Sequence, residues 1–168
     1  MVQEGYWGSR QDLAYYRLVR AWLDELGPGR LIIDVGGADT PVVTWGRFER
    51  RIVIDPGGAS PLEGVESHAE SWLSYHPDER ADVITCLQVL EHLDDEQVAA
   101  FARKLLSSGR TAIISVPYLW PAGSCEHHRQ DPVTLTKLAG WVGQRPRRSV
   151  VVTDGKWRRL VTLFGVGD

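Results

Sequence analysis

The chain lacks the features that mark secreted and membrane-spanning proteins. Its 168 residues include two cysteines, Cys86 and Cys125, too few for a disulfide framework and without C-x-x-C spacing. No stretch approaches the roughly 20 consecutive apolar residues that a membrane helix needs, and the N-terminus shows no secretory signal. We therefore expect a cytoplasmic protein that does not enter a membrane.

An excess of basic charge is also missing. The formal net charge is −3 and the isoelectric point is about 5.9, which argues against general nucleic-acid binding. One local cluster is basic, and we interpret it as the solvated face of a terminal hairpin. It consists of Arg145, Arg147, Arg148, Lys156, Arg158 and Arg159.

The sequence does contain two apolar runs that each end in an aspartate followed by glycines. The first is LIIDVGG over 31–37 and the second is RIVIDPGG over 51–58. Such runs suit parallel strands buried on both faces, and glycines let the backbone turn sharply towards a ligand. In doubly wound sheets an acid about 20 residues after the first turn holds ribose hydroxyls, and Asp55 stands at that position. We therefore predict an adenosine-containing cofactor.

The glycine pattern distinguishes between adenosine cofactors. A dinucleotide site requires G-x-G-x-x-G, whereas here Gly36 and Gly37 are followed by Ala38. An anionic Asp39 in this turn would repel a pyrophosphate but would tolerate a sulfonium or an ammonium group, and Asp34 acts in the same direction. The pattern favours S-adenosylmethionine over NAD. A glycine pair alone is also compatible with an ordinary strand-to-helix turn.

Two later segments complete a family pattern. They read ADVITCLQVLEHLDD over 81–95 and TAIISVPYLWP over 111–121. Together with the D-x-G turn and the acid that ends the second run, they make the chain similar to class I S-adenosylmethionine-dependent methyltransferases of the type 11 kind. The family's turn is usually D-x-G-x-G-x-G, whereas Ala38 and Thr40 replace the later glycines here. The tail over 127–146 also resembles a branch of small bacterial methyltransferases found near sugar and natural-product pathways.

The resemblance implies an α/β fold with a doubly wound, Rossmann-like sheet of seven strands, mostly parallel with an antiparallel last strand. It implies a single methyltransferase domain over 1–168, with an N-terminal helix and lid segment in 1–29 and the core sheet and helices in 30–168.

Local signals place several elements. Apolar residues repeat at helical spacing from Ser9 to Leu26. Asp131-Pro132 favours the start of a helix with Pro132 at its first position, and Asp154-Gly155 favours the turn of a closing hairpin.

The resemblance also implies which residues bind the cofactor. They follow the first, second and third strands or end the fourth. They are Asp34, Gly36, Gly37, Ala38, Asp55, Pro56, Ala69, Glu70, Leu87 and Gln88.

Candidate catalytic side chains fall in two loops after neighbouring strands. Methyl transfer requires alignment of donor and acceptor and, for an oxygen nucleophile, removal of a proton. Histidine has an ordinary pKa close to neutral pH, so His92, His127 and His128 are candidate bases. We assign catalytic roles to His92, His128 and Glu91.

A metal-assisted route is an alternative. Small-RNA 2′-O-methyltransferases and ubiquinone-pathway O-methyltransferases show a Glu-x-x-Glu-His pattern that binds a magnesium-type ion, and this chain is similar with Gln88 in place of the first Glu. Glu91, His92 and His128 are then the ligands of an ion such as Mg²⁺ that acts as a Lewis acid. In many family members the Leu-Glu-His segment instead caps the next helix without a metal.

The expected activity is S-adenosylmethionine-dependent O-methylation of a small molecule, sugar or natural-product intermediate, free or carrier-borne. N-methylation of a similar acceptor and a non-catalytic methyltransferase-like binding protein are the alternatives. The chain has no room for an inserted cap, so a lid must come from the N-terminal segment, from residues 118–130 or from the second subunit of a homodimer. Aromatic candidates for the lid are Tyr6, Trp7, Tyr15, Tyr118 and Trp120, with core packing as the alternative for Tyr15.

Overall fold

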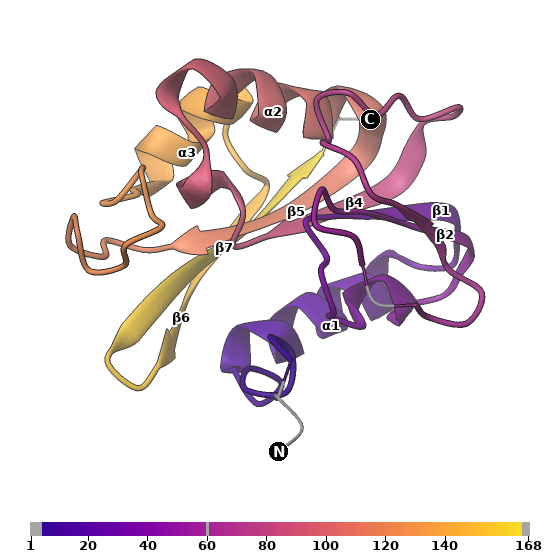
Figure 1. Cartoon of the computed structure of the whole chain (residues 1–168), viewed down its shortest axis with the longest axis horizontal. Helices are drawn as coiled ribbons and strands as arrows, with labels where there is room; N and C mark the ends of the chain where they lie inside the picture. Colours follow the sequence, from indigo (N-terminus) through magenta and orange to yellow (C-terminus); the bar gives the residue numbers. More distant parts are fainter. Residues whose placement is uncertain (1–4, 60, 166–168) are drawn as a thin grey trace.

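The computed structural model describes residues 5–59 and 61–165 (Figure 1). The outer ends of the predicted lid segment and core, 1–4 and 166–168, lie outside the described residues, as does residue 60. None of the helices in the described ranges is long and apolar enough to cross a membrane.

A seven-stranded sheet with the order β3-β2-β1-β4-β5-β7-β6 runs through the molecule. The strands are β1 (Gly29–Val35), β2 (Phe48–Ile54), β3 (Glu66–His68), β4 (Ala81–Leu87), β5 (Gly109–Pro117), β6 (Arg148–Asp154) and β7 (Trp157–Gly165). Strands β1 to β5 pair in parallel, whereas β7 is antiparallel to both β5 and β6. The predicted fold class and the closing hairpin are confirmed.

Helices cover both faces of the sheet (Figure 1). Helix α1 (Ala14–Leu26) packs on one face, and α2 (Asp95–Ser108) and α3 (Leu135–Val142) pack on the other. The central strands are therefore buried on both sides, which requires continuous apolar runs such as 31–33 in β1. Short 3-10 turns, η1 (Val42–Thr44) and η2 (Leu90–His92), follow β1 and β4.

The start of α1 differs from the sequence prediction. The helix begins at Ala14 rather than at Ser9, and the Ala14 N–H donates to the carboxylate of Asp154 over 2.7 Å. A free N–H at a helix start needs an acceptor, and here a residue at the end of β6 supplies it. The boundary thus depends on a contact distant in sequence.

The start of α3 was also predicted incorrectly. The helix begins at Leu135, and Pro132 precedes it instead of taking its first position. Thr134 is the N-cap because its hydroxyl accepts a hydrogen bond from the Lys137 N–H over 3.0 Å.

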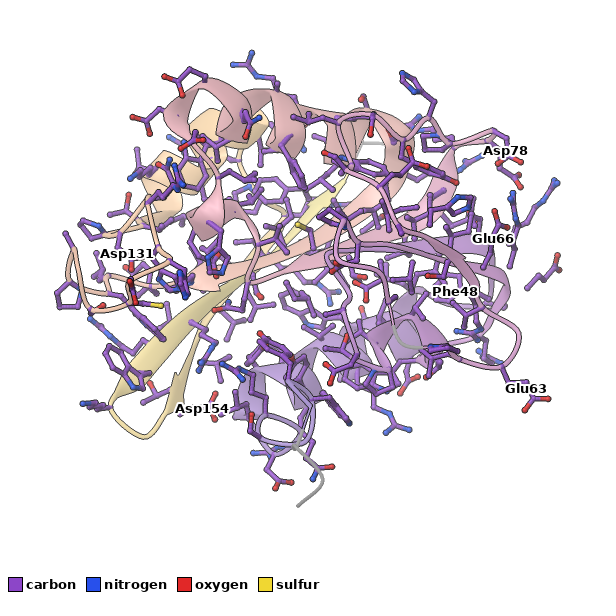
Figure 2. All side chains as sticks on the ribbon, in the orientation of Figure 1. Phe48, Glu63, Glu66, Asp78, Asp131 and Asp154 are labelled. Atoms are coloured by element: carbon purple, nitrogen blue, oxygen red, sulfur yellow. The ribbon has the colours of Figure 1, made fainter. Side chains whose placement is uncertain are left out.

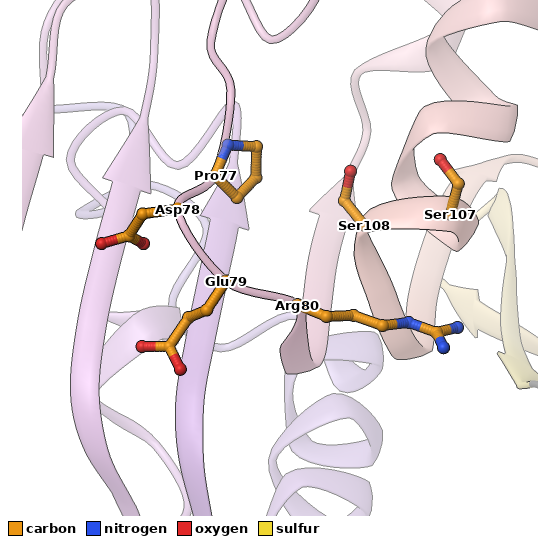
Figure 3. Close-up of a pocket in the computed structure, with 6 residues that line it drawn as sticks. All are labelled: Pro77, Asp78, Glu79, Arg80, Ser107 and Ser108. Atoms are coloured by element: carbon orange, nitrogen blue, oxygen red, sulfur yellow. The ribbon is translucent and has the colours of Figure 1, made fainter.

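The amino and carboxyl ends of the strands carry different groups of residues. In open α/β sheets ligands bind beyond the carboxyl ends of the strands. Figure 3 shows a hollow lined by residues 77–80 and 107–108, which directly precede β4 and β5. This hollow lies at the amino ends of those strands, whereas the predicted site residues follow the carboxyl ends.

Candidate functional site

The turn after β1 brings its backbone close to the loop after β4. Gly36 has a φ of +77°, and a Cβ there would lie 2.4 Å from Cγ2 of Val89. A Cβ at Gly37 would lie 2.6 Å from Oδ2 of Asp34. Both predicted glycines are therefore required for the shape of this turn, Gly36 for its backbone conformation as well.

Asp34 is a buried carboxyl group at the end of β1 with one hydrogen bond. The Thr85 hydroxyl donates to Oδ1 over 2.6 Å, and Oδ2 has no hydrogen-bond partner. Burial raises the pKa of Asp34 to about 7, with a smaller contribution from the charge of Asp55. An unpartnered buried acceptor is a position where a donor of a ligand fits.

Asp55 connects the turns after three strands. Its carboxylate accepts hydrogen bonds from the N–H groups of Ala38 over 3.0 Å and Gly57 over 2.8 Å. Its own N–H donates to the carbonyl of His68 over 3.1 Å. Each carboxylate oxygen has a second lone pair, so Asp55 can still accept from a ligand.

The other predicted cofactor residues surround this corner of the sheet. Pro56 and Ala69 are exposed after β2 and β3, and Glu70 and Leu87 are half-buried. Gln88 has a φ of +57°, and its side-chain amide donates to the Ser115 hydroxyl over 3.1 Å. This hydrogen bond ties the Gln88 amide nitrogen to β5.

Glu91, His92 and His128 meet beyond the carboxyl ends of β4 and β5. One ligand atom from each residue lies within 4.8 Å of the others. Glu91 is 1% exposed, and neither of its carboxylate oxygens has a hydrogen-bond partner in the part of the chain that the structure describes. Burial raises its pKa to about 8. An unsatisfied buried carboxyl next to two imidazoles is arranged to hold a cation or a proton.

In each of the two imidazoles Nδ1 is engaged in a hydrogen bond and Nε2 is left with a free lone pair. His92 Nδ1 lies 2.9 Å from the carbonyl of His127, and because a carbonyl only accepts, Nδ1 carries the hydrogen. His92 Nε2 then has a free lone pair 3.9 Å from Glu91 Oε1. Burial lowers the pKa of His92, which favours its neutral form. His128 Nδ1 lies 2.7 Å from Asp131 Oδ2, which leaves its Nε2 free in the same way.

The loop before α3 is fixed to η2 by backbone hydrogen bonds. The N–H groups of Arg129 and Gln130 donate to the Glu91 carbonyl over 2.7 and 3.2 Å. The Gln130 amide also donates to the Leu93 carbonyl and the Asp95 carboxylate, each over 2.8 Å. These bonds determine that His128 meets Glu91, whereas the His127 side chain remains exposed.

Arg159 is a site residue that the sequence analysis assigned incorrectly to a solvated face. It is 9% exposed, and its guanidinium carbon lies 5.1 Å from the ring centroid of Tyr15 and 5.5 Å from that of Trp120. Strand alternation gave no usable signal, because β7 is buried on both faces and the exposed Arg158 is likewise in phase with buried residues such as Leu160.

The aromatic lid candidates separate into two groups. Trp120 is half-buried, stacks on His128 with a centroid distance of 5.4 Å, and packs at a tilt against Trp157 with a centroid distance of 4.1 Å. The backbone N–H of Trp7 donates to the Asp39 carboxylate over 3.0 Å, so the N-terminal segment contacts the turn after β1. Tyr15 is a core residue, only 1% exposed.

Comparisons with known proteins identify the fold. No protein-family model and no curated protein matches the chain. Among solved structures, the N-methyltransferase NodS from Bradyrhizobium japonicum WM9 is similar with a TM-score of 0.71 and 14% identity, covering 94% of this chain and 99% of that one. Magnesium protoporphyrin IX methyltransferase (ChlM) from Synechocystis PCC 6803, with bound SAH, is similar with a TM-score of 0.65 and 16% identity, covering 89% of this chain and 80% of that one.

The methyltransferase domain of a bacterial CtHen1 also matches. Its TM-score is 0.65 at 18% identity, covering 90% of this chain and 97% of that domain. At these identities the likeness is one of fold. The chain has the fold of class I S-adenosylmethionine-dependent methyltransferases.

Proposed function

We propose that the protein is an S-adenosylmethionine-dependent methyltransferase that methylates a hydroxyl oxygen of a small molecule, sugar or natural-product intermediate, free or carrier-borne. One observation carries this proposal. Beyond the carboxyl ends of the strands, a glycine turn with an unpartnered carboxyl oxygen of Asp34 lies beside a cluster of the buried Glu91, the exposed His92 and the half-buried His128. The fold supports it, since ChlM and NodS have each been solved with SAH.

The residues of the first three turns fit the cofactor. A Cβ at Gly36 or Gly37 would collide with Val89 or Asp34, so this turn is free of side chains of its own, and Asp34 Oδ2 is a buried acceptor suited to an ammonium group. Asp55 would accept the ribose hydroxyls. Of the remaining predicted contacts, Pro56, Ala69 and Glu70 would flank the nucleoside, and Ala38, Leu87 and Gln88 would line the methionine part. When bound, S-adenosylmethionine supplies a methyl group already activated as a sulfonium.

The histidines would remove the acceptor's proton. His128 Nε2 has a free lone pair, and Asp131 would stabilise the imidazolium that forms on protonation. His92 Nε2 is the second candidate, in a neutral imidazole oriented by the His127 carbonyl. Glu91 would serve either as a carboxyl group that hydrogen-bonds to these histidines or as a metal ligand.

A divalent cation held by the same residues is the alternative to the histidine base, because an Nε2 lone pair that binds an ion cannot also accept the acceptor's proton. Glu91 offers two unpartnered buried oxygens, and His92 and His128 each offer a free Nε2, so the residues fit an ion. The ion would polarise the acceptor hydroxyl as a Lewis acid. Two imidazoles and one carboxylate suit Mn²⁺, Fe²⁺ or Zn²⁺ better than Mg²⁺, which prefers oxygen ligands. The donor set therefore favours a transition metal over the Mg²⁺ suggested by the sequence.

Methylation of a nitrogen is the second candidate, favoured by the likeness to the N-methyltransferase NodS. The decisive experiment measures SAH binding by calorimetry and then SAH release from S-adenosylmethionine with a panel of hydroxyl and amine acceptors. Asp55→Asn should weaken SAH binding by about 1–3 kcal/mol because ribose hydroxyls lose an acceptor. Asp24→Asn, an exposed carboxyl on α1, is the control. Failure of the wild type to bind SAH would overturn the proposal.

A further inference from the structure

Arg159 on β7 is a buried cation that the proposed chemistry does not use. Its side chain is 10% exposed, and Nε and Nη1 are buried without a hydrogen-bond partner among residues 5–59 and 61–165. A guanidinium has five N–H donors in a fixed plane, and leaving them unbonded inside a protein is unfavourable. Such a group is suited to binding an oxyanion.

The neighbours of Arg159 do not satisfy these donors. Tyr15 and Trp120 present ring faces to the guanidinium at 5.1 and 5.5 Å. Asp154 Oδ2 lies 3.7 Å from Nη1, which is ion-pair range but too long for a hydrogen bond. The other Asp154 oxygen accepts from the Ala14 N–H, so this carboxylate is held at the start of α1. Asp154 offsets part of the charge without occupying the donors.

Arg159 lies next to the proposed reaction centre. It pairs in register with Pro117, the last residue of β5, at the carboxyl edge of that strand. The Trp120 indole that covers the guanidinium also stacks on His128, whose ring lies 4.9 Å from that of His92. Asp131, the partner of His128, and Asp154, the neighbour of Arg159, lie towards the same end of the molecule (Figure 2).

We propose that Arg159 binds an anionic group, a carboxylate or a phosphate, of the methyl acceptor, so that the acceptor is an acid. This inference rests on the proposed methyltransferase function and specifies its substrate class. The guanidinium fork matches both oxyanions bidentately. The indoles of Trp120 and Trp157 pack against each other at a tilt of 33°, and they form an apolar surface beside the charge against which a carbon skeleton can pack.

The test uses benzoate and inorganic phosphate as probes, titrated into the full chain by calorimetry with and without SAH. At least one of the two anions should bind to the wild type, and the stronger one distinguishes a carboxylate site from a phosphate site. Arg159→Gln should weaken that binding by about tenfold or more, because charge-assisted hydrogen bonds are lost. Arg158→Gln is the matched control, since Arg158 is the exposed neighbour on the same strand.

A second variant keeps the test valid if Arg159→Gln unfolds. Asp154→Asn retains an acceptor for Ala14 but removes the charge opposite Arg159, so it should tighten anion binding. If Arg159 serves only as a structural ion pair, Asp154→Asn should lower the melting temperature and leave anion binding unchanged, which would overturn the inference.

The outcomes separate the two proposals. SAH binding without Arg159-dependent anion binding would refute the acid acceptor and leave the methyltransferase proposal intact. Arg159-dependent anion binding without any SAH binding would support the anion site and refute the methyltransferase proposal.

Discussion

His128 donates through Nδ1 to Asp131 over 2.7 Å, with side chains that are 7% and 1% exposed. This pair orients the imidazole so that its other nitrogen belongs to the cluster with Glu91 and His92. A buried carboxylate that orients a histidine is a recurring arrangement for both general bases and metal ligands. The pair therefore makes His128 the most constrained of the candidate bases.

Replacement of His128 should abolish most of the methyl transfer. His128→Ala removes the proton acceptor and should lower the rate about 10²–10⁴-fold with SAH affinity preserved. His127→Ala is the matched control, because His127 contributes only its backbone carbonyl to His92. Equal rates for the two variants, measured by SAH release with an accepted substrate, would show that His128 is not the base.

The metal assignment predicts opposite effects of one substitution under two conditions. With Mn²⁺ present at about 100 times its Kd, the wild type should gain roughly 2.7 kcal/mol of stability, and Glu91→Gln should gain almost none. In a chelator above pH 8, Glu91→Gln should instead be more stable than the wild type, because it removes a buried charge.

Melting curves with and without EDTA provide this measurement. Glu96→Gln, an exposed acid in the first turn of α2, should behave as wild type under both conditions. An equal Mn²⁺ effect in all three proteins would place the ion elsewhere.

Gly36 should tolerate no side chain. In Gly36→Ala the Cβ would lie 2.4 Å from Val89 in a residue with φ of +77°. Gly58 has a φ of +79° with nothing within 4 Å of a Cβ, so Gly58→Ala tests backbone strain alone. We expect Gly36→Ala to be less stable than Gly58→Ala by about 1–3 kcal/mol and to bind SAH more weakly. Similar free energies of unfolding for the two variants, measured by urea titration, would contradict the close approach of Gly36 to Val89.

Asp34 should make stability depend on pH. Its folded pKa, about 7, is raised above the ordinary 3.8 by burial. The unfolded chain therefore releases this proton first, and the free energy of unfolding falls as pH rises from about 4 to about 7, by at most roughly 4 kcal/mol. The protonated Asp34 thus contributes its full stabilisation below about pH 4, and this contribution is lost as the pH rises to about 7.

Asp34→Asn isolates this contribution. Asparagine does not titrate and can still accept from Thr85. The difference in free energy of unfolding between Asp34→Asn and wild type should grow with pH across this window, whereas Asp24→Asn should track the wild type. A pH-independent difference would mean that Asp34 is ionised when folded.

The sequence by itself determined the features that depend on neighbouring residues. Buried apolar runs, the acid–glycine strand ends at Asp34 and Asp55, and the turn at Asp154-Gly155 are local signals, since strand period and turn chemistry act over a few residues. Together with the resemblance to class I methyltransferases, they were sufficient for the fold class and for placing the candidate residues after the right strands. The single-domain assignment, the homodimer and the cytoplasmic location stay predictions.

Only the tertiary structure decided which of these residues meet. His128 meets Glu91 because the loop before α3 bonds to the backbone of η2, and the Gln88 amide nitrogen is held by the Ser115 hydroxyl on β5. Arg159 is buried because β7 inserts between β5 and β6 and faces α1. Side-chain burial and unpaired donors depend on which elements are adjacent in space, and the charge pattern of the sequence does not predict that adjacency.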